Sequence, residues 1–196
     1  MNTAKAIVYK LYMGETRNPL LINFISKNES GFKESLLHSG KSVRRNWPKK
    51  FTVTVDGTQP IDYFMCGGRY GVVSQRAMDV VQSFTEDTVE FLPVQVISQN
   101  LGGPIGQYWI LNILTNIDAL DWKRTMWGSA EVPYDNEWAS FLKPAFKLKM
   151  VENQHMFVLR IGKTIRSGIF VSDALRKSLK INNADLGMGF VPLKVT

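Results

Sequence analysis

Apolar residues occur in short runs separated by turn residues along the first third of the chain. Residues 6–11 and 20–25 form two such runs, and residues 51–55 alternate between polar and apolar before Asp56-Gly57. Alternation with a period of two is typical of a half-buried strand, and Asp-Gly is typical of a turn. These patterns predict strands in all three segments, although the run at 20–25 is short enough to fit a helix. A short helix is also possible at residues 32–37.

Residues 71–96 carry the pattern of a strand, a helix and a second strand. Apolar residues 71–73 are followed by Ser74, a residue type that favours a helix N-cap, and apolar residues then recur at helical spacing over 77–81. Residues 90–96 read as a strand. Pro93 has no N–H to donate, so we expect this strand to lie at a sheet edge or to carry a bulge.

The same pattern returns over residues 168–193. An apolar run ends at Ser172, apolar residues follow at helical spacing, and Phe190-Val-Pro-Leu193 resembles Phe91-Leu-Pro-Val94 after a one-residue insertion. Two units of the same order and nearly the same spacing indicate an internal structural repeat. The alternative is that two ordinary strand–helix–strand units look alike.

The remaining apolar segments complete a predicted α+β fold with a mainly antiparallel sheet and two serine-capped helices. Residues 108–114 form a near-continuous apolar strand that fits a sheet centre. Residues 146–150 alternate, and residues 151–154 join them to an apolar strand at 155–160, which predicts a hairpin. No linker-like stretch divides the chain, so we expect one domain over residues 1–196. The predicted core consists of Ile7, Val72, Val81, Leu92, Ile110, Leu111, Phe157, Phe170, Leu175 and Phe190.

Charge is distributed unevenly along a chain of ordinary globular composition. The net charge of +7 divides into +6 over residues 1–60 (ten Lys/Arg, four Asp/Glu), −6 over residues 61–140 (four and ten) and +7 over residues 141–196 (ten and three). Two solvated basic faces around an acidic middle are the simplest interpretation. The same pattern also suits steering toward a charged protein partner, or binding of nucleic acid by the basic ends.

The location of the protein is predicted from its lone cysteine and its apolar segments. With only Cys66 no intramolecular disulfide is possible, which favours the cytoplasm. The first residues lack the apolar run and cleavage site of a signal peptide, and no apolar stretch approaches the ~20 residues that span a bilayer. We therefore expect a cytoplasmic protein without membrane contact.

No group of residues indicates catalysis. His38 and His155 have no partners at metal-ligand spacing, and Cys66 has no identifiable base. Residues 67–71 resemble a phosphate loop only loosely, because the Gly-Lys-Ser/Thr ending is missing. We expect neither an enzyme nor a bound metal or cofactor, and a small buried apolar role for Cys66.

Large aromatic residues gather in one irregular segment. Trp122, Trp127, Tyr134 and Trp138 lie outside any predicted element. Such residues either pin a loop to the core or form a recognition surface, and the sequence leaves both alternatives open. Nearby carboxylates, such as Asp118, fit a solvated acidic face.

Several of these motifs together resemble one protein family. They are Val73-Ser74, Phe91-Leu-Pro-Val94, Leu120-Asp121-Trp122, Val171-Ser172 and Phe190-Val-Pro-Leu193. Over roughly residues 60–193 the chain resembles the immunity-protein eleven family of bacterial polymorphic toxin systems, whereas the basic N-terminal part, residues 1–60, lies outside the resemblance. In that family a serine often follows the Asp-Trp pair closely, and the candidate position here is Thr125, so this detail of the resemblance is not reproduced.

The resemblance implies a protein that binds and neutralises a cognate toxin effector by occlusion. Our predicted anchors for the toxin are Trp122, Trp127, Tyr134 and Trp138. A basic toxin would face Asp118, Asp135 and Glu137, and an acidic toxin would face Arg44, Arg45, Lys49 and Lys50. The main alternative is a basic nucleic-acid-binding module, and a hydrolase using Cys66 and His155 is a third hypothesis. The oligomeric state is not predicted.

Overall fold

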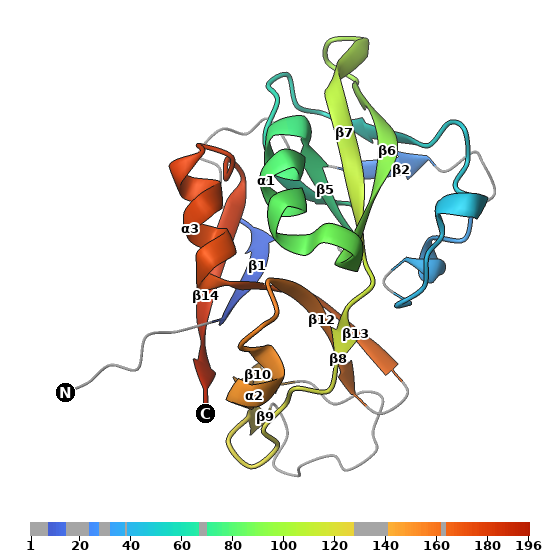
Figure 1. Ribbon diagram of the computed structural model, residues 1–196. Coiled ribbons are helices and arrows are strands. Elements are labelled where there is room, and N and C mark those ends of the chain that lie inside the picture. Colours follow the sequence, from blue (N-terminus) through green and yellow to red (C-terminus); the bar gives the residue numbers. More distant parts are fainter. Residues whose placement is uncertain are drawn as a thin grey trace.

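Two curled β-sheets form the body of the protein. A computed structural model describes residues 8–14, 24–27, 32–37, 39–66, 70–127, 141–161 and 164–196. Within these residues there are two six-stranded sheets and one small two-stranded sheet (Figure 1). The two large sheets lie against each other with helices along one side.

The first large sheet, here called the terminal sheet, combines strands from both ends of the described chain. Its order is β11 (Ala145–Phe146), β14 (Met188–Val195), β1 (Val8–Met13), β13 (Thr164–Ser172), β12 (Met156–Ile161) and β8 (Asn116–Ile117). The second, the central sheet, has the order β2 (Phe24–Lys27), β3 (Thr52–Val55), β6 (Val89–Ser98), β7 (Gly103–Ile113), β5 (Tyr70–Ser74) and β4 (Tyr63–Cys66). The small sheet pairs β9 (Met126–Trp127) with β10 (Phe141–Lys143).

Two amphipathic helices, α1 (Gln75–Thr85) and α3 (Asp173–Ile181), pack beside each other along the sheets (Figure 1). A four-residue helix α2 (Leu148–Val151) and the 3₁₀ turns η1 (Glu34–Leu36), η2 (Arg44–Asn46) and η3 (Glu86–Thr88) complete the elements. At the start of α3, Asp173 pairs with Arg176 at 2.8 Å and with Lys177 at 2.7 Å. Burial would raise the pKa of Asp173, but these partners outweigh it and lower the pKa to about 2.

Both long helices begin at the predicted serines. The Ser74 hydroxyl accepts a hydrogen bond from the Ala77 N–H, and the Ser172 hydroxyl accepts one from the Leu175 N–H. Each serine thereby satisfies one of the N–H groups that the first helical turn leaves without a partner.

The strands around the two helices also share one register. In the central sheet, Trp109 of β7 pairs with Val73 of β5 on one side and with Pro93 of β6 on the other. In the terminal sheet, Tyr9 of β1 pairs in the same way with Val171 of β13 and Pro192 of β14. The residues aligned in the sequence therefore hold the same places around a middle antiparallel strand. We predict that the backbones of residues 71–94 and 168–193 superpose as similar strand–helix–strand units.

Three apolar layers fill the fold. Successive strand residues face opposite sides, so Val72 and Val73 lie in different layers, as do Phe170 and Val171. The layer that holds Val73 and Val171 also contains the buried apolar residues of α1 and α3, and it includes residues of both large sheets. Of the predicted core, Ile7 lies outside the described residues, Phe190 is half-buried, and the other eight side chains are buried.

The predicted hairpin over residues 146–160 is wrong. Only Ala145 and Phe146 form a strand, the chain then turns into α2, and β12 pairs with β13 and β8 instead. The apparent alternation misled because Leu148 and Met150 are 39% and 42% exposed, whereas Val151 is buried. Burial here follows a helical turn rather than a pleat.

Pro93 lies on an inner strand of the central sheet, at a position where only one side of that strand is paired. Strand β6 has β7 on one side and β3 on the other, so the predicted edge position of the whole strand is wrong. However, β3 pairs only with Gln95–Ser98, so no described strand lies beside Pro93 on that side, and the Pro93 carbonyl accepts a hydrogen bond from the Trp47 indole N–H instead. The register with β7 also shifts between Gln95 and Ile97, an irregularity of the kind that the proline predicts.

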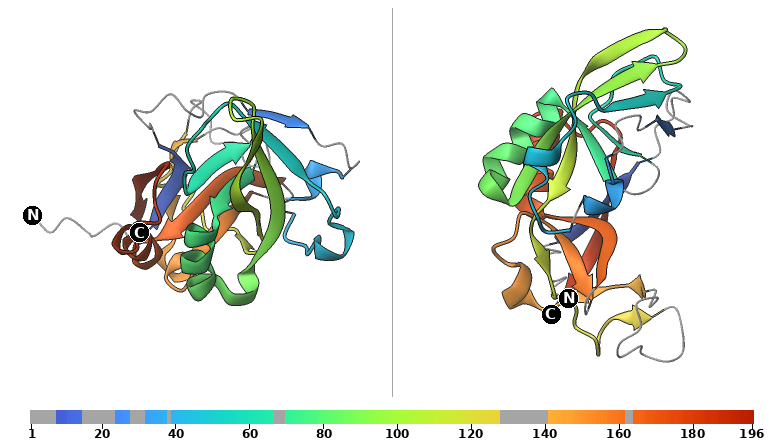
Figure 2. Two further views of the ribbon diagram at one scale, coloured as in Figure 1. Left: turned by 90° about the horizontal axis from the view of Figure 1, so that it is seen from above. Right: turned by 90° about the vertical axis from the view of Figure 1, so that its right-hand side faces the viewer.

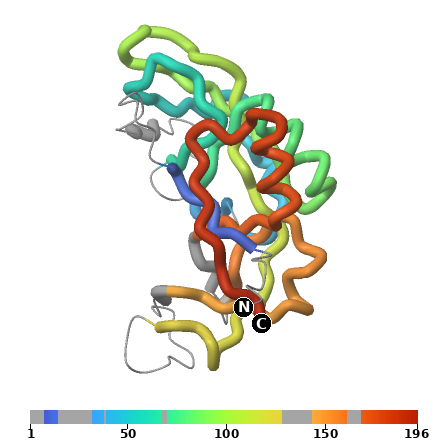
Figure 3. Tube along the Cα trace, turned by 90° about the vertical axis from the view of Figure 1, so that its left-hand side faces the viewer, coloured from blue at the N-terminus to red at the C-terminus, as the bar shows by residue number. Residues whose placement is uncertain are grey.

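The overall arrangement is α+β with mainly antiparallel sheets. Parallel pairing occurs between β3 and β6, β8 and β12, and β11 and β14. The predicted central place of residues 108–114 is confirmed, because β7 lies between β6 and β5. The β6–β7 hairpin extends away from the end of the molecule where the C-terminus lies (Figure 2). Strand β14 runs toward that end, and β1 lies beside it and runs in the opposite direction (Figure 3).

Candidate partner-binding surfaces

The segment 119–127 forms a turn that hydrogen bonds hold against β11. The Asp121 carboxylate accepts from the Arg124 N–H at 3.2 Å and from the Thr196 hydroxyl at 2.9 Å. Burial would raise the pKa of Asp121, but these hydrogen bonds outweigh it and lower the pKa. Asp121 therefore shapes this turn and ties it to residue 196.

Thr125 fastens the other end of the turn. Its buried hydroxyl donates to the Asp121 carbonyl at 2.8 Å and accepts from the Ala145 N–H at 3.1 Å. The contact needs a hydroxyl, which threonine and serine both supply.

The two described tryptophans of this turn face each other. The rings of Trp122 and Trp127 stack at a centroid distance of 4.9 Å, and the Trp127 indole N–H donates to the Trp122 carbonyl at 3.2 Å. Both are half-buried against the apolar layer that contains Phe146. Asp118, just before the turn, is exposed. Tyr134, Asp135, Glu137 and Trp138 lie outside the described residues.

A second surface is built on residues 42–50, which a buried glutamate holds against the central sheet. Glu90 accepts hydrogen bonds from the Ser42 hydroxyl, from the Val43 N–H at 3.0 Å and from the Asn112 amide at 2.8 Å. Burial would raise the pKa of Glu90, but these donors outweigh it and lower the pKa. Arg44, the first residue of η2, follows Val43 directly, so the hydrogen bond from Val43 to Glu90 positions the start of η2.

Trp47 fixes the far side of η2. Its indole N–H donates to the Pro93 carbonyl at 2.9 Å, and its ring stacks on Phe51 at 4.8 Å. Arg44, Arg45, Lys49 and Lys50 are exposed around this anchored segment, and we call these four residues the basic turn. Two of them, Lys49 and Lys50, line a groove of about 380 Å³ beside the β6–β7 hairpin. The four basic residues that lie close in the sequence therefore also lie on one anchored segment of the surface.

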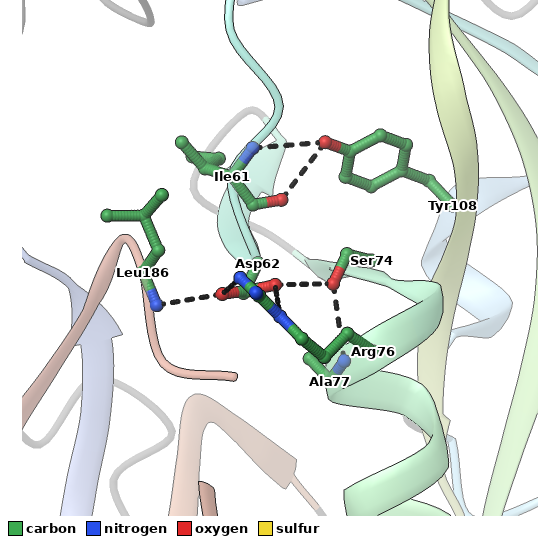
Figure 4. A network of polar contacts seen from close by, with 7 residues as sticks. All are labelled: Ile61, Asp62, Ser74, Arg76, Ala77, Tyr108 and Leu186. Atoms are coloured by element: carbon green, nitrogen blue, oxygen red, sulfur yellow. Dashed lines mark hydrogen bonds and ion pairs between the residues drawn. The ribbon is translucent and has the colours of Figure 1, made fainter. Parts of the chain in front are cut away.

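A buried carboxylate links the central sheet, α1 and the loop before β14 (Figure 4). Asp62 accepts from the Ser74 hydroxyl at 2.7 Å, from Arg76 at 2.7 and 3.2 Å, and from the Leu186 N–H at 3.0 Å. The hydrogen bond to Asp62 raises the pKa of Arg76. Nearby, the Tyr108 hydroxyl donates to the Ile61 carbonyl at 3.0 Å.

The loop that Asp62 holds also approaches β4 very closely. Gly187 has a φ of +88°, and a Cβ placed there would lie 2.5 Å from the Tyr63 carbonyl oxygen. Only glycine fits such a position without displacing backbone. Sequence reasoning missed this junction because its partners lie more than a hundred positions apart. The sequence around Ser74 and Arg76 predicts only a helix N-cap. No local pattern indicates that the Leu186 N–H binds Asp62.

The residues considered for catalysis contact the core or other structural elements. Cys66 is buried, as expected, and the His155 ring packs edge-on against Phe84 and contacts the Ser172 hydroxyl at 3.0 Å. His38 lies outside the described residues. Within the described ranges, no three His, Cys, Asp or Glu side chains are grouped so that they could hold a metal ion.

Comparison with known proteins identifies the family. The immunity protein family (Imm11) matches residues 17–195. The chain belongs to this family. The Imm11 match begins well before residue 60, so residues 17–60 of the basic N-terminal part belong to the family region, and the extent of about 60–193 expected from the sequence motifs is too narrow. No curated protein matches the chain.

Membership of Imm11 indicates a role in immunity to a toxin, with a toxin as the general class of partner. The family is one of immunity proteins and not of enzymes. Among the helices of the described Imm11 residues, none is long and apolar enough to cross a bilayer.

Proposed function

We propose that this Imm11 protein binds a cognate bacterial toxin effector in the cytoplasm, one to one, and neutralises it by occluding its active surface. The match to an immunity protein family over residues 17–195 is the observation that carries this proposal. Occlusion requires only a rigid surface that complements the toxin, with no chemistry and no cofactor of its own.

The charge distribution supports rapid capture of a charged toxin. Basic segments flank an acidic middle segment, and a potential of this kind raises the rate of diffusional encounter with a partner of complementary charge. Speed matters to occlusion because each free toxin molecule acts until it is bound.

The contact residues predicted from the sequence remain proposals. The basic turn, Arg44, Arg45, Lys49 and Lys50, is a rigid exposed surface suited to an acidic toxin. Trp122 and Trp127, with Asp118 as a neighbouring charge, would serve a basic toxin through the exposed parts of the stacked pair. Tyr134, Trp138, Asp135 and Glu137 complete that second set.

A growth assay tests the proposed function. A heterologous bacterial host expresses the effector encoded next to this gene, with or without the Imm11 protein, and the two purified proteins are mixed for size-exclusion chromatography. We expect restored growth and co-elution at one-to-one stoichiometry. Absence of both rescue and complex would refute the proposal. Weak binding to oligonucleotides that falls steeply with salt, without rescue, would favour the nucleic-acid alternative instead.

A further inference from the structure

A basic pocket lies where four separate parts of the chain meet. Its volume is about 720 Å³, and Lys10 of β1, Arg124 of the 119–127 turn, Lys143 of β10 and Lys194 of β14 line it. No acidic side chain is among the described residues that line this cavity. We call it the cationic pocket, and Figure 3 shows β1 and β14 side by side on the face where they lie.

Among the described residues, little negative charge compensates the cations of this pocket. Lys10, Lys143 and Lys194 are exposed, and in the described part of the chain none of them forms an ion pair. Arg124 reaches Asp121 only at 3.8 Å and is itself 58% exposed. Like charges around one concavity repel each other and reinforce a positive potential inside it. An anionic group that enters the pocket relieves this repulsion.

Part of the lining of the pocket is apolar and exposed to solvent. Met126 is 53% exposed and Val191 is 43% exposed, and both line the cavity together with the cations. Exposed apolar side chains enclosed by charge resemble the centre and rim of a protein–protein contact. None of the described lining residues is aromatic, so the pocket offers no ring on which a nucleic-acid base could stack.

The strand edge in the pocket is unsuited to pairing with a partner strand. Strand β11 pairs only with Lys194 and Val195, so the preceding residues of β14 have β1 on one side and no described strand on the other. Pro192 lies in this open stretch and Pro144 lines the same pocket, and proline has no N–H to donate to a ladder. Recognition here therefore depends on side-chain charge and apolar contact, rather than on strand addition.

Strand pairing and hydrogen bonds hold the backbone that carries the four cations. Three of the cations stand on strands, and the turn that carries Arg124 is fastened through Asp121 and Thr125 to β11 and to Thr196. A recognition site gains affinity when its groups are already in place, because less conformational entropy is lost on binding.

We propose that the cationic pocket receives an acidic segment of the cognate toxin. The toxin's carboxylates face Lys10, Arg124, Lys143 and Lys194, and one of its apolar side chains packs on Met126 and Val191. This inference rests on the proposed toxin-binding function, and it places the main contact at this pocket rather than at the basic turn.

Charge reversal at the pocket tests the proposal against a matched surface. The pocket variant carries Lys10→Glu, Lys143→Glu and Lys194→Glu, and Arg124 is kept because it pairs with Asp121. The control variant carries Lys149→Glu, Arg160→Glu and Lys180→Glu, which makes the same change of net charge at exposed positions outside the pocket and outside the basic turn. Toxin affinity is measured by isothermal titration calorimetry at low and moderate salt, and thermal unfolding confirms that both variants fold.

We expect the pocket variant to bind the toxin about 100-fold more weakly and the control variant to stay within about threefold of the wild type. The affinity of the wild type should also fall more steeply with salt than that of the pocket variant. If the triple variant does not fold, the milder pair Lys143→Gln and Lys194→Gln replaces it, with an expected loss of about tenfold.

Three results would overturn the inference. The pocket variant binds within threefold of the wild type, the control variant loses as much affinity as the pocket variant, or the pocket variant loses only oligonucleotide binding. If the wild-type protein restores growth and any of these results is found, the proposed function stands and only the pocket as contact site is refuted. Failure of the wild-type protein to bind or rescue removes both.

Discussion

Replacing Asp62 with asparagine should destabilise the protein strongly, although the two side chains have nearly the same shape. Asp62 is buried, and its two oxygens receive four hydrogen bonds from Ser74, Arg76 and Leu186. Asparagine keeps one oxygen and presents an NH₂ group in place of the other. If its oxygen faces Arg76 Nη2 and the Leu186 N–H, the NH₂ group faces Ser74, whose hydroxyl can accept, and Arg76 Nε, which cannot.

The size of the effect follows from what this best arrangement loses. In this arrangement one hydrogen bond from Arg76 is lost, and the remaining hydrogen bonds are made to a neutral amide instead of a charged carboxylate. Hydrogen bonds to charged groups contribute ~1.5–3 kcal/mol each. The Arg76 side chain is 55% exposed, so solvent screens part of its attraction and the lower half of that range applies to it. We expect a loss of about 2–3 kcal/mol in the free energy of unfolding, or roughly 5–10 °C in melting temperature.

Urea denaturation followed by circular dichroism measures this change. Asp118→Asn is the matched control, because the same chemical change at an exposed carboxylate should cost less than about 0.5 kcal/mol. Arg76→Gln and the double variant complete a cycle, and the two changes should be non-additive by about 1 kcal/mol or more. An Asp62→Asn protein as stable as the control, or strict additivity in the cycle, would refute the role given to this carboxylate.

Three further predictions concern single side chains. Thr125→Val should lower the free energy of unfolding by about 1–3 kcal/mol, because the Ala145 N–H loses its buried acceptor, whereas Thr125→Ser should be milder; chemical denaturation of both variants checks this. Glu90→Gln should release the 42–50 segment, which faster proteolysis there would reveal and unchanged cleavage would contradict. Asp173 has a pKa of about 2 against an ordinary 3.8, so its stabilisation is present above pH 3.8 and is lost as the pH falls toward 2. Denaturation midpoints measured across this pH range should therefore fall less steeply with acid for an Asp173→Asn protein than for the wild type.

Local signals made the two capped helices predictable from the sequence. A serine before a helical apolar pattern marks a helix start through contacts that span only three residues, as at Ser74 and Ser172. The shared tetrapeptides located Pro93 and Pro192 at equivalent positions, since each pairs with a residue of the middle strand. Such features need no knowledge of distant partners.

Features that depend on distant partners were not predictable in this way. Alternation over residues 146–150 fitted a strand, but burial at Val151 made a helical turn the better solution, and β12 found its partner in β13. The exposed charges of the basic turn were recognisable because they are adjacent in sequence. Lys10, Lys143 and Lys194 belong to segments that only the sheet order brings together, so no local pattern points to their pocket.

The place of β1 between β13 and β14 has a consequence for synthesis on the ribosome. All strands of the central sheet lie within residues 24–113, so that sheet can assemble while the rest of the chain is still being made. The terminal sheet requires Val8–Met13 to wait for strands that are translated last. Its completion closes a loop of nearly the whole chain, a step with a high entropic cost and a slow rate. Until then Val8 and Leu11 stay uncovered, so nascent chains should engage chaperones, and full protection against a toxin should lag behind translation.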